Sequence, residues 1–103
     1  MASILITGAL STKAHRLKNE LAGEAVIMGD FNDVPAVMIK SGMMVKLPHP
    51  EAIAYPHQML TFCLDNNVSS VYTLNTEEFI GLEPSMQLFM EYGIEIQIVK
   101  NDL

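Results

Sequence analysis

The chain has 103 residues, which is enough for one domain and too short for two. Half of the residues are apolar, which excludes an intrinsically disordered chain. The net charge of −6 argues against a nucleic-acid partner, because proteins that bind nucleic acids carry basic surfaces.

The single cysteine, Cys63, cannot form an internal disulfide, which is typical of a reducing compartment. No signal-peptide pattern follows Met1, and no apolar run approaches the roughly 18 residues of a membrane span. We therefore expect a cytoplasmic protein with no membrane partner.

The start of the chain predicts a strand followed by a helix. Residues 3–7 (SILIT) form the continuous apolar run of a strand covered on both faces. Gly8 ends this run, and either Ser11 or Thr12 can cap the following helix. Gly23 is expected to end that helix.

The next segment predicts two more strands separated by an irregular stretch. Residues 24–29 (EAVIMG) predict a second buried strand that stops at Asp30. Residues 31–42 are interpreted as turns, since Pro35 favours a turn near their start. Residues 43–47 are expected to form the third strand.

The second half of the chain repeats the alternation of helix and strand. Apolar residues at helical spacing predict a helix over residues 53–65, and residues 70–74 (SVYTL) predict a fourth strand. Asn75 and Glu78 have the spacing of a capping box at the start of another helix.

The end of the chain predicts a split helical region and a final strand. Gly81 and Pro84 are expected to divide a short helix from a longer one that ends near Tyr92. Residues 94–99 (IEIQIV) alternate strictly, as expected of a strand at the edge of a sheet.

Alternating strands and helices predict a single α/β domain over residues 1–103, a three-layer Rossmann-like sandwich. The expected sheet has five mainly parallel strands in the order 3-2-1-4-5. Ligands of such sheets bind at the carboxyl ends of the strands. That crevice would be bordered by residues 8–12, 30–33 and 75–78.

The string GDFN at residues 29–32 matches a signature of metal-dependent nucleases and phosphatases of DNase-I type. That chemistry requires further metal ligands and a general-base histidine with its orienting aspartate. Only 29 residues precede Asp30, no Ser-Asp-His string follows, and the surrounding pattern is that of a parallel sheet. We therefore reject the phosphoesterase interpretation.

A dinucleotide site is also rejected. Asp30 lies 22 residues after Gly8, as in the fingerprint of NAD- and FAD-binding folds. The loop nevertheless reads GALST, and Leu10 at the second glycine position would block a pyrophosphate. We expect no cofactor.

Five segments in order resemble the pre-ATP-grasp domain, the N-terminal Rossmann-like domain of carbamoyl-phosphate-synthase-like ATP-grasp ligases. They are ILITGA, GDFNDVP, VKLP, SVYTLNTEEF and LFMEYGIEIQIV, and together they cover nearly the whole chain. The family usually has a TGAGG-type first loop, from which this chain departs at Leu10 and Ser11.

The resemblance implies a domain that helps to hold an acceptor substrate, because later domains of those ligases bind ATP and carry the chemistry. It implies an anion contact at the first loop, from Gly8, Ala9, Ser11 and Thr12. It also implies ligand contacts from Asp30, Thr76, Glu77 and Glu78.

Simpler roles explain the same residues. Ser11 and Thr12 can act as helix caps beside a solvated Lys13, and Asp30 can belong to a turn. Glu77 and Glu78 can stabilise the first turn of a helix through its dipole. The three histidines share no metal-ligand spacing, and Cys63 is expected to be an inert core thiol.

Three functions remain open. The chain can be a noncatalytic interaction module, acting as a homodimer or beside a separate ATP-grasp chain; its eight methionines agree with this. It can instead be a sensor of a nucleotide or carboxylate metabolite, with a small anionic ligand in the crevice. We rank an enzyme last, because no nucleophile–base pair can be identified from the sequence.

Overall fold

The computed structural model describes residues 3–21, 23–32, 34–42, 44–74 and 76–98. The strands are β1 (Ser3–Ile6), β2 (Ala25–Asp30), β3 (Val45–Lys46), β4 (Val68–Thr73) and β5 (Glu95–Ile98). The helices are α1 (Thr12–Glu20), α2 (Ala36–Lys40), α3 (Tyr55–Asp65), α4 (Thr76–Leu82), α5 (Met86–Glu91) and the short 3-10 helix η1 (Glu83–Ser85).

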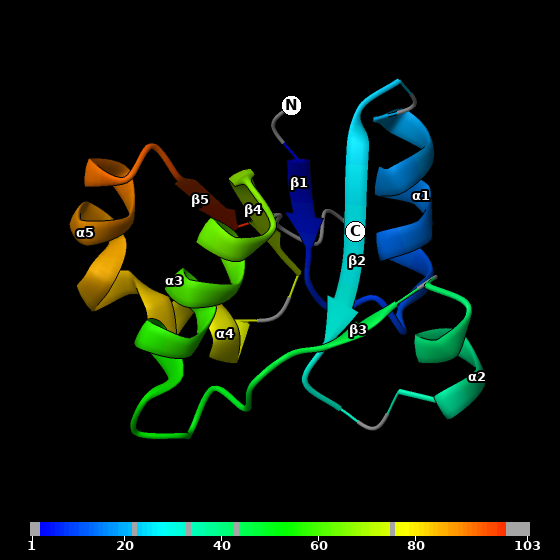
Figure 1. The fold of residues 1–103 in the computed structure, drawn as a ribbon, viewed down its shortest axis with the longest axis horizontal. Helices are drawn as coiled ribbons and strands as arrows, with labels where there is room; N and C mark the ends of the chain where they lie inside the picture. Colours follow the sequence, from blue (N-terminus) through cyan, green and yellow to red (C-terminus); the bar gives the residue numbers. More distant parts are fainter. Residues whose placement is uncertain (1–2, 22, 33, 43, 75, 99–103) are drawn as a thin grey trace.

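The five strands form one sheet in the order β3-β2-β1-β4-β5, and every neighbouring pair is parallel. The predicted α/β class and strand order are therefore confirmed. The order reverses direction between β1 and β4, where β1 pairs with β2 on one side and with β4 on the other. Figure 1 shows α1 and α2 on one side of the sheet and α3, α4 and α5 on the other.

Each face of the sheet has its own apolar core. Leu5 of β1 faces the larger core, which also contains Tyr55 and Phe89 from the helices on its side. Ile6, the next residue, faces the smaller core with Ala14 of α1. Adjacent residues of a strand point to opposite faces, so the continuous apolar run of β1 reflects burial on both sides.

The segment interpreted as turns contains a helix that the sequence did not predict. α2 occupies Ala36–Lys40, directly after Pro35, and Met38 packs against the smaller core. A helix of five residues is too short for a helical pattern to be recognised in the sequence.

The other differences are shifts of element ends. β4 begins at Val68, two residues before its predicted start, and β2 includes Asp30 instead of ending before it. The predicted division near Pro84 is confirmed, since η1 separates α4 from α5, but the prediction that the second helix is the longer one is wrong: α5 has six residues and α4 has seven. The predicted cap at Asn75 lies outside the described residues.

Candidate functional site

The carboxyl ends of the central strands surround a small depression at the point where the strand order reverses. It has a volume of about 270 Å³. Its lining residues are Gly8, Leu10, Ser11, Asp30, Asn32 and Leu74. Three of the predicted ligand contacts, Gly8, Ser11 and Asp30, are thus brought together by the fold.

The first loop is held by its own hydrogen bonds. Gly8 has a φ of 67°, in the left-handed region that favours glycine. The N–H of Ala9, a fully buried residue, donates to the carbonyl of Gly29 at 3.0 Å. The N–H of Ser11 donates to the carbonyl of Gly8 at 3.0 Å, and the Ser11 hydroxyl accepts from the N–H of Ala14 at 3.3 Å.

Ser11 therefore caps α1, as one of the two sequence interpretations proposed. Thr12 is the first residue of α1 and is exposed. Lys13 follows it, and its ammonium nitrogen is buried without a hydrogen-bond partner among the described residues. A buried cation at the start of a helix is an attractive neighbour for an anion, since the helix dipole acts in the same direction.

Asp30 connects the ends of β1 and β2 through its side chain. It is 3 % exposed, and its Oδ2 accepts from the N–H of Leu10 at 3.1 Å. Its Oδ1 accepts from the N–H of Asn32 at 2.9 Å and from the Asn32 side-chain amide at 3.1 Å. Both carboxylate oxygens are therefore engaged in positioning the two loops that border the depression.

Lys46 of β3 is hydrogen-bonded to the segment that carries the GDFN string. Its ammonium donates to the carbonyl of Phe31 at 2.7 Å and to that of Asn32 at 2.9 Å. The polar atoms of the string thus interact with the chain itself. Asp33, the last acidic residue of this segment, lies outside the described residues.

The predicted contacts on α4 separate into two environments. Thr76 and Glu77 are exposed and do not line the depression. Glu78 is completely buried, and neither of its carboxyl oxygens has a hydrogen-bond partner among the described residues. The simpler interpretation, in which both acids stabilise the first turn through the helix dipole, agrees with the place of both residues on α4, but it did not anticipate the burial of Glu78.

Glu78 belongs to a buried polar cluster that sequence reasoning missed. Burial raises its pKa to about 7. The hydroxyls of Thr7 and Tyr55 lie near the carboxyl group without hydrogen-bond geometry and oppose the rise in part, while the charges of Asp30 and Glu77 add to it. Tyr55 is 1 % exposed, and burial, followed by the nearby Glu78 charge, raises its pKa as well. A tyrosine at the first residue of a helix gives no sequence signal for such a contact.

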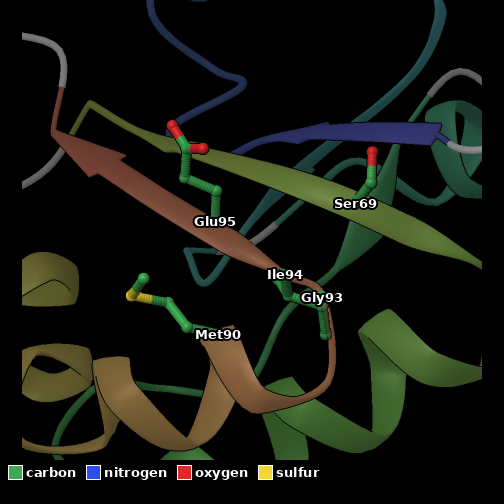
Figure 2. Close-up of a pocket in the computed structure, with 5 residues that line it drawn as sticks. All are labelled: Ser69, Met90, Gly93, Ile94 and Glu95. Atoms are coloured by element: carbon green, nitrogen blue, oxygen red, sulfur yellow. The ribbon is translucent and has the colours of Figure 1, made fainter.

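A second kind of surface lies on α5, away from the strand ends. Met90 is 64 % exposed and Tyr92, just after the helix, is 55 % exposed. Figure 2 shows Met90 extending from α5 toward β5, with Gly93 and Ile94 in the turn that joins them. These three residues, with Ser69 and Glu95, line a depression with a volume of about 270 Å³.

A larger depression of about 720 Å³ adjoins it and shares Met90. Its lining residues are Glu83, Pro84, Met86, Gln87, Met90 and Glu91. We refer to these residues as the α5 surface. It combines exposed apolar side chains with an acidic border.

Other chemical groups give no additional site. Within the described ranges, no group of three or more His, Cys, Asp or Glu residues could hold a metal ion. Cys63 is buried in the larger core, as expected, and burial raises the pKa of its thiol to about 12. In the same part of the chain, no helix has the length and apolar character needed to cross a membrane.

Comparison with family models and with curated proteins identifies no relative of the chain. No protein-family model matches the chain, and no curated protein matches it. The resemblance to pre-ATP-grasp domains therefore rests on the sequence segments alone.

Proposed function

We propose that this chain is a noncatalytic interaction module of pre-ATP-grasp type, which works by contacting another protein through the α5 surface. The observation that carries the proposal is a contrast between two regions. Asp30 at the strand ends is occupied by internal hydrogen bonds, whereas the α5 surface leaves the side chain of Met90 in water.

The strand-end depression offers few groups for a ligand. A ribose or a cation would have to compete with Leu10 and Asn32 for the carboxylate of Asp30. Displacing such hydrogen bonds costs about 1.5–3 kcal/mol for each bond to a charged group. This supports a structural role for Asp30 and favours a function located elsewhere on the molecule.

The α5 surface has the composition expected of a protein contact. Methionine and tyrosine are enriched in interface cores, while charged residues gather at the rim. Pro84, Met86 and Met90 supply the apolar part, and Glu83 and Glu91 line the same depression. Met side chains also adapt their shape to a partner.

The partner that we propose is a second copy of the chain. A separate ATP-grasp chain is the alternative protein partner for the same surface. Two copies in contact through α5 would bring their acidic borders close together. Salt screens such repulsion, because the Debye length falls from about 10 Å at 0.1 M to about 3 Å at 1 M. Self-association through this surface is therefore expected to become stronger as salt is added.

Sedimentation velocity of two charge-matched variants tests the proposal. Met90→Lys places a charge in the middle of the α5 surface, and Ile53→Lys places the same charge at a fully exposed apolar residue elsewhere. We expect the first variant to be monomeric and the second to self-associate like the unmodified chain. Equal behaviour of the two variants would refute the role of the α5 surface.

A second function, sensing of a small anion, is favoured by one specific observation. The buried ammonium of Lys13 has no hydrogen-bond partner among the described residues, and Lys13 is in the first turn of α1, two residues after Ser11, which lines the depression. Under this alternative, a nucleotide or a carboxylate metabolite would raise the thermal unfolding temperature. Lys13→Met should abolish that rise without unfolding the protein, and an unchanged rise would exclude this site.

A further inference from the structure

Glu78 is placed where a charged carboxylate cannot be accommodated. Its side chain has no exposed area, and both oxygens lack hydrogen-bond partners among the described residues. The hydroxyl of Tyr55 is also buried and also lacks a hydrogen-bond partner among the described residues. An unpaired buried carboxylate is costly, because burial removes its hydration and nothing replaces it.

The surrounding charges make the cost larger. The side chains that act on the Glu78 carboxyl are Thr7 at the end of β1, Asp30 of β2, Tyr55 of α3, and Glu77 of α4 itself. Cys63, a further titratable group, contributes to the raised pKa of Tyr55. The charged members, Asp30 and Glu77, are acids, so they repel a negative charge on Glu78. A neutral carboxylic acid is therefore the form that suits the folded protein.

The helix that carries Glu78 is a short unit that packs against α3, β4 and β5. α4 has seven residues and is followed directly by η1. Gly81 lies against the ring of Tyr55, since a Cβ on Gly81 would be 3.1 Å from that ring. Leu82 is buried in the larger core. The Glu78 side chain lies on the same inward face as these contacts.

We propose that Glu78 makes α4 a proton-operated latch. With its proton, the carboxyl group stays inside, where it can donate a hydrogen bond to the hydroxyl oxygen of Thr7 or Tyr55. Without the proton, the carboxylate leaves the interior for water, and α4 moves away from β1 and α3 with it. The transition falls near neutral pH, because burial raises the pKa of Glu78 to about 7.

The movement has a structural consequence at the strand ends. α4 follows β4, and Leu74, at the end of that strand, lines the depression with Gly8 and Asp30. Release of α4 uncovers the buried cluster beside this depression. The latch therefore makes the exposure of this cluster depend on pH.

Hydrogen exchange measured by mass spectrometry tests the latch on the full chain, at pH values from 5.5 to 8 and after correction for intrinsic exchange rates. Amides of residues 76–82 in the unmodified chain should lose at least tenfold in protection between these limits. Glu78→Gln keeps the shape of the side chain and cannot ionise, so it should remain protected throughout. Glu20→Gln changes an exposed acid on α1, on the other side of the sheet, and should behave like the unmodified chain.

The outcomes separate the latch from general unfolding. Amides of β1, residues 3–6, should stay protected at both pH limits, because only α4 is released. A titration of the Glu78 carboxyl carbon by NMR should show a midpoint near 7 in the unmodified chain. A midpoint near 4.5, or equal loss of protection in Glu78→Gln, would overturn the proposal.

Discussion

Replacing Asp30 by alanine is expected to destabilise the protein more than any role as a ligand contact would suggest. The substitution removes Oδ2, the acceptor for the N–H of Leu10, and Oδ1, the one acceptor for both the N–H and the side-chain amide of Asn32. Asn32 is exposed and its donors can bond to water instead, so the loss of its two hydrogen bonds should lower stability only slightly. The N–H of Leu10 loses its charged acceptor in a partly buried part of the first loop.

The magnitude follows from these three bonds. A hydrogen bond to a charged group contributes about 1.5–3 kcal/mol, and an unsatisfied buried donor costs about 1–3 kcal/mol. Removing the negative charge of Asp30 also relieves its repulsion of Glu78, which offsets part of the loss. We expect a net decrease of about 2–4 kcal/mol in the free energy of unfolding, and about 1–2 kcal/mol for Asp30→Asn, which keeps one acceptor oxygen.

Urea unfolding at pH 7, followed by far-ultraviolet circular dichroism, measures this change. Asp65→Asn is the matched control, because Asp65 is exposed at the end of α3 and should change stability by less than about 0.5 kcal/mol. If Asp30→Ala proved as harmless as the control, the reasoning that Asp30 joins the two loops would be refuted.

Three further outcomes are expected. Because the pKa of Glu78 is raised from 4.5 to about 7, its contribution to stability is present below pH 4.5 and is lost as the pH rises through 7; Glu78→Gln should therefore gain about 3 kcal/mol over the unmodified chain in urea unfolding at pH 8. Gly29→Ala should lower the free energy of unfolding by about 1–3 kcal/mol, since its Cβ would lie 2.8 Å from Cγ of Leu47 and 2.9 Å from Cγ2 of Val45. Cys63 should resist iodoacetamide in the native protein and react fully in urea, because burial raises its pKa to about 12 and thiolate is the reactive form; native labelling within minutes would contradict this.

The sheet could be predicted because its strands are patterned by burial on both faces. The apolar runs around Leu5 and Val71 alternate with helices, and this alternation permits few topologies. α2 could not be predicted, because five residues are too few to repeat a helical pattern and tertiary packing of Met38 supplies its stability.

The depression at the strand ends was also predictable, because parallel strands bring their carboxyl ends to one edge of the sheet. Gly8, Ser11 and Asp30 meet there for that reason. The environment of Glu78 was not predictable. Its place in the first turn of a helix fits a solvated acid equally well, and burial depends on Tyr55, which is 23 residues away in the chain.

The central claim is that the α5 surface is a protein contact, and the mass of the unmodified chain in solution tests it most directly. Light scattering over a series of protein concentrations, at about 0.1 M and 1 M salt, gives that mass under weak and strong screening. We predict a mass that rises toward twice that of one chain with concentration, and rises further at high salt. The mass of a single chain at every concentration and in both salts would contradict the proposed self-association.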